Sequence, residues 1–388
     1  MKTSEIRCAL VTLNPFPVGN VTTIRYSSYM SAIAKAGCFS KVYIYAPTRT
    51  AKANKEVSGI HNGVHYEYTS GKITLANRNI VLLLYYMLVG LLKCGRSVVK
   101  DNINVLIVGN PPLLVSLYLK ILCKIYDIRF YGERSELPYT HFPNNKIKQW
   151  IYAKKIQLHD GMILMTDELI KFYSGLLKGK KPTFLLPMTI DCHRFDNVRK
   201  LQMDYEYIAV VFGVHNRDGL LDSIKSYNRY RELGGTYHLQ LIGNYECMPN
   251  RLELDKEISN CKYKECIHIC GVLQSDKLPQ ILKNASCLMT TPQEYISGGF
   301  PTKLGEYMLS GVPIVATAAG DVLKYVENNS EIKFSEPSDV ESIARSLLHV
   351  EQNREENLEM ANRAEIKARK VFNAETYIPS LLKFLIGS

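Results

Sequence analysis

Residues 297–317 read Ser-Gly-Gly-Phe-Pro-Thr-Lys-Leu-Gly-Glu-Tyr-Met-Leu-Ser-Gly-Val-Pro-Ile-Val-Ala-Thr, a glycine-rich loop followed by a helical stretch and a strand. Pro301 stands where the first turn of a helix should begin, and proline suits that position because its missing N–H would have no partner there. We expect the helix to run from Thr302 to Ser310 and a buried strand to lie at Pro313–Ala316. A loop, a helix and a strand in this order are typical of one unit of an α/β fold.

The same alternation of apolar runs and helical stretches extends over most of the chain. In the second half, further strands are expected at Tyr207–Val214, Leu239–Ile242, Ile267–Val272 and Cys287–Thr290. In the first half, they are expected at Cys8–Leu13, Lys41–Ala46, Val105–Val108, Ile128–Tyr131, Met162–Met165 and Thr183–Leu186. A long polar helical stretch follows at Val340–Ala368, and a final, apolar one at Thr376–Ile386. This alternation predicts an α/β fold with two Rossmann-like, doubly wound parallel-sheet domains that face a cleft.

Composition and charge set the class of protein and its division into domains. The chain has 388 residues, 46% hydrophobic and 22% charged, which excludes a disordered chain and a disulfide-stabilised mini-domain. Residues 1–200 hold 28 Lys and Arg against 12 Asp and Glu, a net charge of +16, whereas the remainder holds 20 against 25, or -5. We therefore predict a basic domain at 1–200, a second domain at 201–372, and a C-terminal helix at 373–388 that crosses back to the first.

The basic half is expected to face an anionic partner. Motifs typical of nucleic-acid binding are missing from it, so we expect an anionic membrane surface and no nucleic acid. The thirteen residues Ile80–Leu92 carry no charge and are flanked by Arg78, Lys93 and Arg96. A spanning helix needs about 20 apolar residues, so this stretch either lies in the membrane surface or packs against the sheet. Because Cys8–Leu13 is too short for a secretory signal, we expect a cytoplasmic protein, peripheral on the inner face of the cell membrane.

The cysteines and histidines allow one alternative reading as a metal site. Cys261, Cys266, His268 and Cys270 are close together in the sequence and could be zinc ligands. The expected strand Ile267–Val272 favours instead a buried position, where cysteine is a common small residue. The sequence also contains no two aspartates spaced Asp-x-Asp, so we predict no metal site and no cofactor.

The stretch at 297–317 also suggests its own chemistry. The free N–H groups of Thr302, Lys303 and Leu304 at the start of the expected helix, together with the helix dipole, form a site for an anion. Lys303 adds a mobile positive charge, and Glu306, one turn further along, can accept hydrogen bonds from two hydroxyl groups. A phosphate next to a pair of hydroxyls describes a nucleotide sugar. The alternative is an ordinary glycine loop that caps a helix.

These residues resemble the donor-site motif of family-4 retaining glycosyltransferases, which have the two-domain GT-B fold. The family motif has a Glu, seven residues, a second Glu, and then a small residue, Gly, any residue, Pro and a hydrophobic residue. Glu306 matches the second Glu, and Gly311 and Pro313 match the string that follows. The first Glu, which holds the donor sugar in the family, falls on Gly298. The resemblance implies that backbone amides take its place, at Gly298, Gly299 and Phe300, or else the side chain of Glu294.

Other segments resemble the family in the expected order. Phe212–Gly219 is similar to the loop that grips the donor diphosphate, which assigns that role to Gly213 and Arg217. The strand ends that hold the base would include Gly243, Gly271, Val272 and Leu273. Leu186–Asp191 with Phe195 resembles the family's interdomain signature, and Pro15–Asn20, with Gly19 and Asn20, resembles the acceptor-domain loop that closes over the donor. Glu133, at a strand end of the first domain, is the expected acceptor-facing group.

The resemblance implies transfer of a sugar from a nucleoside diphosphate donor, a UDP-sugar by preference, to a hydroxyl of a lipid-linked glycan in surface polysaccharide synthesis. Residues 1–200 would face the acceptor and the membrane, and 201–372 would bind the donor. Arg217, Lys303, Glu306 and Glu133 would be the catalytic residues. One alternative is a nucleotide-sugar 2-epimerase of the same fold, for which the sequence shows no acid–base pair. Another is a non-enzymatic membrane-surface protein. A dinucleotide-binding oxidoreductase and a P-loop NTPase are disfavoured, because neither glycine signature is present.

Overall fold

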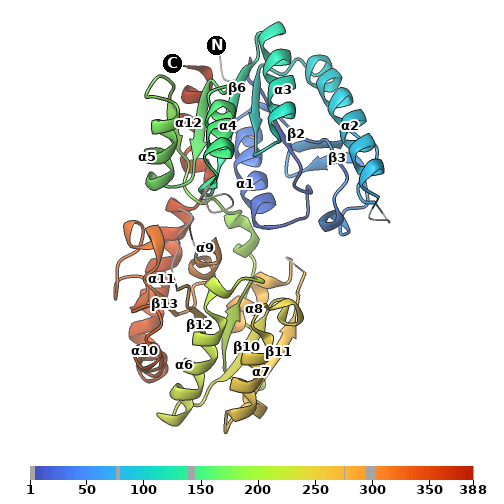
Figure 1. Cartoon of the computed structure of the whole chain (residues 1–388). Coiled ribbons are helices and arrows are strands. Elements are labelled where there is room, and N and C mark those ends of the chain that lie inside the picture. The colour runs from blue at the N-terminus through green and yellow to red at the C-terminus, as the bar shows by residue number, and fades with distance from the viewer. Residues whose placement is uncertain are drawn as a thin grey trace. The chain divides into compact units, whose positions relative to one another are not determined.

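A computed structural model describes residues 5–75, 79–138, 145–274, 276–293, 300 and 302–387. The chain forms two compact units, each built around one sheet (Figure 1). Unit 1 consists of Met1–Asp191 and Asn373–Ser388, and unit 2 of Cys192–Phe372. The packing therefore divides the chain after Asp191, somewhat before the boundary expected at residue 200, and the C-terminal segment is part of unit 1. The expected α/β class with two parallel-sheet units is confirmed.

Unit 1 has an eight-stranded sheet in the order β3-β4-β2-β1-β5-β6-β7-β8. Its strands are β1 Arg7–Thr12, β2 Phe39–Ile44, β3 Ser58–His61, β4 Val64–Tyr68, β5 Val105–Val108, β6 Arg129–Arg134, β7 Gly161–Leu164 and β8 Thr183–Leu185. Neighbouring strands run parallel except β3 and β4, which form an antiparallel hairpin. The sequence reasoning did not expect this hairpin. Its turn is Asn62-Gly63, and both residues have positive φ, 48° and 79°.

The helices of unit 1 cover both faces of this sheet. They are α1 Val21–Lys35, α2 Ile80–Lys100, α3 Leu113–Ile125, α4 Lys146–Ile156, α5 Asp167–Leu176 and α12 Ile378–Ile386. Side chains of β1 alternate between the faces, so Cys8 and Leu10 pack with α1 and α12, whereas Ala9 and Val11 pack with α2 and α3. Helices α2, α3 and α4 follow one another as neighbours (Figure 1). These three helices, with α5 packed next to α4, form the outer surface of one side of unit 1.

Unit 2 has a six-stranded parallel sheet in the order β11-β10-β9-β12-β13-β14. Its strands are β9 Tyr207–Val211, β10 His238–Ile242, β11 Ile267–Gly271, β12 Cys287–Thr290, β13 Ile314–Thr317 and β14 Lys333–Ser335. Its helices are α6 Leu220–Glu232, α7 Arg251–Asn260, α8 Leu278–Asn284, α9 Thr302–Leu309, α10 Val340–Gln352 and α11 Arg354–Val371. The core between sheet and helices contains Tyr227, Tyr230 and Tyr237 besides aliphatic side chains.

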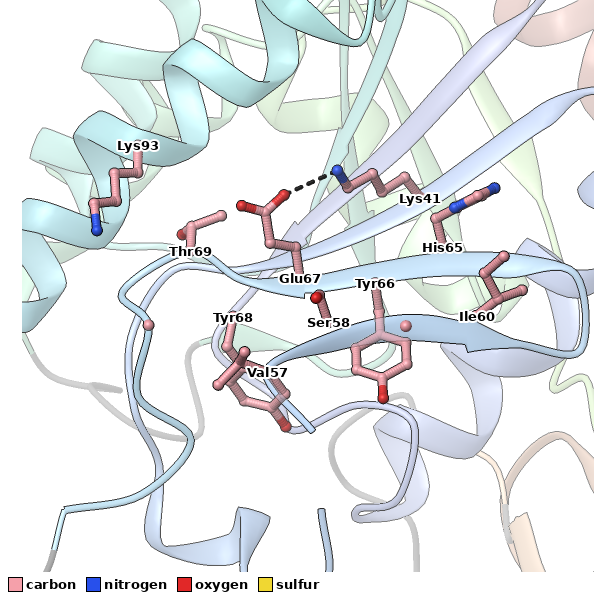
Figure 2. A pocket seen from close by; sticks show the side chains of 12 residues that line it. Lys41, Val57, Ser58, Ile60, His65, Tyr66, Glu67, Tyr68, Thr69 and Lys93 are labelled. Carbon is pink, nitrogen blue, oxygen red and sulfur yellow. Dashed lines mark ion pairs between the residues drawn. The ribbon is translucent and has the colours of Figure 1, made fainter. Parts of the chain in front are cut away.

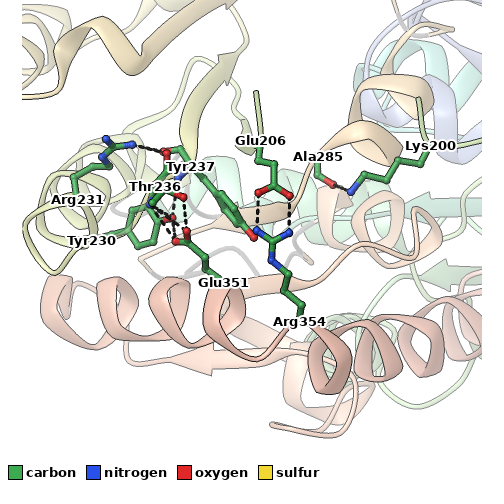
Figure 3. A network of polar contacts seen from close by, with 9 residues as sticks. All are labelled: Lys200, Glu206, Tyr230, Arg231, Thr236, Tyr237, Ala285, Glu351 and Arg354. Atoms are coloured by element: carbon green, nitrogen blue, oxygen red, sulfur yellow. Dashed lines mark hydrogen bonds and ion pairs between the residues drawn. The ribbon is translucent and has the colours of Figure 1, made fainter. Parts of the chain in front are cut away.

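Two expectations for unit 2 were wrong. Strand β11 is not buried, because it forms the edge of the sheet and leaves Ile269 48% exposed. The long helix expected at 340–368 is broken at Asn353, which lies between α10 and α11 with φ -118° and ψ 57°. Polar contacts secure this break (Figure 3): Arg354 makes a two-pronged ion pair with Glu206, at 2.8 and 2.6 Å.

Candidate functional site

The glycine predicted to bind the diphosphate, Gly213, and those predicted to bind the base, Gly243 and Gly271, lie together at the carboxyl edge of the unit 2 sheet. Gly213 follows β9, Gly243 follows β10 and Gly271 ends β11. The Gly243 N–H donates to the Gly271 carbonyl at 2.9 Å, and a Cβ on Gly243 would come within 2.5 Å of the Phe212 carbonyl oxygen. Backbone segments can approach this closely only where there is no side chain. Ligands of open α/β sheets bind at this edge, outside the carboxyl ends of the strands.

Helix α9 is fixed to the same edge by one tyrosine. The Tyr307 hydroxyl accepts the Val211 N–H at 2.7 Å and donates to the Met289 carbonyl at 3.3 Å. These two contacts join α9 to the last residues of β9 and β12. The helix begins at Thr302, as predicted, and its buried face includes Leu304. Lys303 and Glu306 are therefore held at the edge where the strand-end glycines lie.

Lys303 already has an anionic partner within unit 2. Its ammonium lies 2.6 Å from Oδ2 of Asp218, and the same oxygen accepts the Gly213 N–H at 2.6 Å. Burial would raise the pKa of Asp218, but the Lys303 charge and the Gly213 hydrogen bond outweigh it and hold the pKa below its usual value. Sequence reasoning missed Asp218. Two of the residues assigned to the phosphate, Gly213 and Lys303, thus meet at this carboxylate.

The loop that carries Asp218 is fixed by a glycine. Gly219 has φ 71°, and a Cβ there would lie 1.7 Å from the Thr291 carbonyl oxygen. The Thr291 hydroxyl in turn donates to the Gly219 carbonyl at 2.8 Å. Arg217, the predicted diphosphate ligand, lies in the same short turn with an exposed side chain, and its carbonyl accepts the Gln293 N–H at 3.2 Å. From this loop, the side chain of Asp218 contacts Lys303.

Glu306 also has a partner that the sequence did not indicate. Its carboxylate oxygen lies 2.5 Å from the Arg194 guanidinium, and the Glu306 side chain is 12% exposed. Arg194 directly precedes Phe195, which belongs to the signature quoted above. The ion pair restricts the rotamers of Glu306 and so fixes the position of its carboxylate.

The remaining predicted donor residues differ in what they can contribute. The Phe300 ring is buried against Tyr325 and Phe372, with centroids 5.6 and 5.4 Å away, so it packs in the core of unit 2. The Leu304 side chain is buried as well. Val272 and Leu273 follow the exposed strand β11. Glu294, Gly298 and Gly299 lie outside the described residues.

In unit 1, the expected acceptor-side residues have structural partners. Glu133 is a correction: its side chain is 2% exposed and lies 2.8 Å from Nε of Arg25, so it is an internal ion pair rather than an acceptor-facing group. Arg25 also donates to the carbonyls of Leu186 and Pro187, which ties α1 to the end of the sheet. Asn20 caps α1, because its Oδ1 accepts the Thr23 N–H at 3.1 Å. Gly19 leaves no room for a side chain, since a Cβ would lie 2.3 Å from Thr23 Oγ1.

A cavity of about 520 Å³ in unit 1 was not predicted from the sequence. It is lined by the β3–β4 hairpin, by Lys41 of β2 and by Lys93 of α2 (Figure 2). Lys41 lies 2.9 Å from Glu67 and 2.7 Å from Asp101, so its charge is compensated within the protein. The charged residues Lys41 and Glu67 in the wall of this cavity are therefore explained by ion pairs within unit 1.

The cysteine-rich segment does not gather metal ligands. Cys261 and Cys266 are buried, Cys270 is exposed, and His268 contacts His238, with Nε2 and Nδ1 2.9 Å apart. In the part of the chain that the structure describes, no three His, Cys, Asp or Glu side chains lie close enough together to hold a metal ion.

Comparisons with known proteins agree with this architecture. Residues 194–370, nearly all of unit 2, match the model of the family described as glycosyl transferases group 1. No match was found among curated protein sequences. Sucrose-phosphate synthase from Thermosynechococcus elongatus is 14% identical with a TM-score of 0.73, and the alignment covers 98% of this chain and 99% of that chain.

Two further solved structures give the same result. HepE from Anabaena in complex with UDP is 12% identical, with a TM-score of 0.68 over 99% of this chain and 100% of that chain. The lipopolysaccharide outer core galactosyltransferase WaaB is 12% identical, with a TM-score of 0.61 over 98% and 99%. The chain has the GT-B fold, and the family match over unit 2 supports a glycosyltransferase.

Proposed function

We propose that the protein is a retaining glycosyltransferase. It would transfer the sugar of a UDP-sugar donor to a hydroxyl group of a lipid-linked glycan in surface polysaccharide synthesis. The observation that carries the proposal is the edge of the unit 2 sheet, where the Lys303 ammonium and the Gly213 N–H converge on one oxygen and Glu306 follows one helical turn later. A phosphate oxygen takes the same two kinds of donor. The family match of residues 194–370, and the structural neighbour HepE solved with UDP-glucose, support a nucleotide-sugar donor.

The chemical task is to stabilise the departing diphosphate. The bond between the anomeric carbon and the phosphate oxygen breaks, and its electron pair stays on the phosphate. The acceptor oxygen then bonds to the same face of the sugar, and the leaving phosphate takes its proton. Lys303, Arg217 and the first N–H groups of α9 would offset the growing negative charge. We expect no metal ion to be needed, because the sequence has no Asp-x-Asp pair to hold one on the diphosphate.

We further propose that unit 1 lies on the anionic inner surface of the cell membrane, with the protein otherwise in the cytoplasm. Helices α2, α3 and α4 each leave one stripe of large apolar side chains in contact with solvent. The stripes are Ile80, Val81, Leu84, Tyr85, Leu88 and Leu92 on α2, Leu114, Leu117, Ile121 and Ile125 on α3, and Ile147, Trp150 and Ile151 on α4. On α3 and α4, and on α2 from Leu84 onward, the spacing follows the helical repeat, so these side chains lie on one face of each helix. At the start of α2, Leu82 and Leu83 are exposed as well, so its first turns are open to solvent on all sides.

Charge complementarity supports a lipid surface as the partner of these helices. Together α2, α3 and α4 contain nine Lys or Arg residues and no Asp or Glu. An apolar stripe among basic side chains is typical of helices that lie in the interface of an anionic bilayer. Helix α2 is the one helix in the described part of the chain that is long and apolar enough to cross a membrane. It links β4 to β5 of one sheet and buries Leu91, Cys94 and Val98 in the core, which favours a surface position.

A panel of nucleotides tests the proposed donor chemistry. We expect UDP to raise the melting temperature more than ADP, GDP or NAD does, since a ligand at 100 times its Kd adds about 2.7 kcal/mol to the stability of the folded state. Slow release of free sugar from a UDP-sugar, and transfer to lipid extracts, should accompany this. Formation of an epimerised nucleotide sugar without transfer would favour an epimerase, and no effect of any nucleoside diphosphate would refute the proposal.

A further inference from the structure

The carboxylate of Asp218 occupies the position that a phosphate oxygen would need in order to use Lys303 and Gly213. Both donors meet at Oδ2, each at 2.6 Å. A backbone N–H and an ammonium on one oxygen are the contacts that proteins use to bind phosphate. The Asp218 side chain is 11% exposed and the Lys303 side chain 24%, so water screens the pair only in part. The two groups that would donate to a phosphate, the Lys303 ammonium and the Gly213 N–H, thus already donate to Asp218, which is negatively charged like the ligand.

Local contacts fix the backbone of the loop that carries this carboxylate. Gly219, directly after Asp218, is locked by its positive φ and by its close contact with Thr291. Asp218 also stays ionised at neutral pH, because its pKa is held below its usual value. A phosphate group that takes over Lys303 must therefore lie within a few ångströms of a fixed negative charge, and at that distance like charges repel strongly in a partly buried site.

This repulsion is not the same for the donor and for the product. In a nucleotide sugar, the terminal phosphate has one ester bond to the sugar and one anhydride bond to the inner phosphate, and it carries one negative charge. After the bond to the anomeric carbon breaks, the same phosphate keeps only the anhydride bond and gains a second ionisation with a pKa near 6, so it carries almost one more charge at pH 7. A neighbouring carboxylate consequently opposes the product more than the donor.

We infer that Asp218 is a specificity-determining residue, which lowers the affinity of the site for the nucleoside diphosphate product relative to the nucleotide-sugar donor. This inference rests on the proposed function. Asp218 thereby promotes product release and limits product inhibition. Asp218 also weakens binding of the donor itself, and Glu306, Gly243 and Gly271 offset this loss through contacts away from the terminal phosphate.

The test compares dissociation constants of UDP, UDP-glucose and uridine by titration calorimetry. Asp218→Asn removes the charge but keeps the shape, and its amide oxygen can still accept the Gly213 N–H. We expect UDP to bind about tenfold tighter to this variant, UDP-glucose only about threefold tighter, and uridine with unchanged affinity. The matched control is Glu232→Gln, which removes the same charge from an exposed residue of α6 that pairs with Arg229 at 3.0 Å.

Three results would overturn the inference, and they differ in what else they overturn. If Asp218→Asn binds UDP and UDP-glucose with the wild-type dissociation constants, so that their ratio is unchanged, Asp218 does not discriminate between product and donor. Weaker binding of both ligands would show that it only supports Lys303. If the wild-type protein binds neither UDP nor UDP-glucose, nor ADP or GDP, the proposed function itself fails and the inference with it.

Discussion

The two units share one architecture but present opposite surfaces. In unit 1, the outer helices α2, α3 and α4 carry apolar stripes, and all of their charged side chains are basic. Acidic residues appear only on the neighbouring helix α5, with Asp167 and Glu168 in its first turn. In unit 2, the outer helices α6, α7, α10 and α11 each carry charges of both signs. Their side chains are joined in polar contacts such as the pairing of Glu351 with Tyr230 and Thr236 (Figure 3). Exposed apolar residues of these helices, such as Leu252 and Ile366, lie singly rather than in stripes.

The difference shows that the fold alone does not determine which side chains a unit exposes on its outer helices. A parallel sheet needs apolar helix faces only toward the sheet, and unit 2 meets that need with a polar outer surface. Unit 1 has more apolar side chains on its helices than folding requires, since its apolar stripes stay in contact with solvent. Contiguous exposed apolar surface of this kind usually marks a binding partner. We therefore expect that the nucleotide chemistry proposed for unit 2 and the lipid contact proposed for unit 1 can be disrupted separately.

The largest effect is expected from Lys303→Ala in unit 2. This change removes the positive charge that offsets the departing diphosphate, and loss of one such stabilising donor costs about 10²- to 10³-fold in kcat. Steady-state transfer kinetics measure the effect. Lys283→Ala, which removes a lysine paired with Glu365 at 3.9 Å elsewhere in unit 2, is the control and should retain activity. Equal activity of the two variants would refute the role of Lys303.

A somewhat smaller effect is expected from Glu306→Ala. Loss of a hydrogen bond to a charged group costs about 1.5–3 kcal/mol, which corresponds to roughly a 10- to 150-fold lower kcat/KM. Arg194→Ala should lower kcat/KM less, because Arg194 acts through Glu306, and Arg194→Lys should restore part of the loss. The double variant should resemble Glu306→Ala alone. Fully additive losses would show that Arg194 acts independently of Glu306.

Removal of two basic residues from the outer helices of unit 1 should weaken lipid binding without affecting the nucleotide site. Each Lys near an anionic surface contributes about 1 kcal/mol, so Lys93→Gln with Lys124→Gln should lower vesicle binding about 30-fold at low salt. Co-sedimentation with anionic vesicles measures this. The control changes the exposed Lys256 and Lys264 of unit 2 to Gln. Equal losses in both double variants would contradict a specific face on unit 1.

The smallest effect concerns stability. Leu88 of α2 is 57% exposed, so Leu88→Gln should change the free energy of unfolding by no more than about 0.5 kcal/mol. The same variant should bind vesicles less tightly, because it removes one apolar contact with the bilayer. Denaturant unfolding and co-sedimentation are the two measurements. A large loss of stability with unchanged vesicle binding would mean that this stripe packs within the protein.

The strands of both sheets were largely predictable from sequence, because parallel strands are continuous apolar runs. The observed bounds of β5, Val105–Val108, and of β12, Cys287–Thr290, equal those expected. The hairpin β3–β4 was missed although Asn62-Gly63 is a strong local signal for it. Helix α7 at Arg251–Asn260 was also missed, because its sequence is mostly polar and has little apolar periodicity.

The candidate site was predictable only where its residues share one segment. Lys303 and Glu306 were placed on α9 from the loop, proline and helix pattern, and the helix begins where expected. Their partners were not found, because Asp218 is 85 residues from Lys303 and Arg194 is 112 residues from Glu306. For the same reason the sequence did not show that Glu133 is paired within unit 1, because its partner Arg25 is 108 residues away. Nothing in a local motif shows which distant charge will be packed against it.

Hydrogen exchange with UDP and with anionic vesicles tests the central claim that the two units have separate partners. We predict that UDP slows exchange in unit 2, around the loop after β9 and helix α9, and leaves α2, α3 and α4 unchanged. Anionic vesicles should slow exchange in α2, α3 and α4 and leave the unit 2 helices α6, α7, α10 and α11 unchanged. Protection of those unit 2 helices by vesicles, or protection by UDP confined to unit 1, would contradict the account.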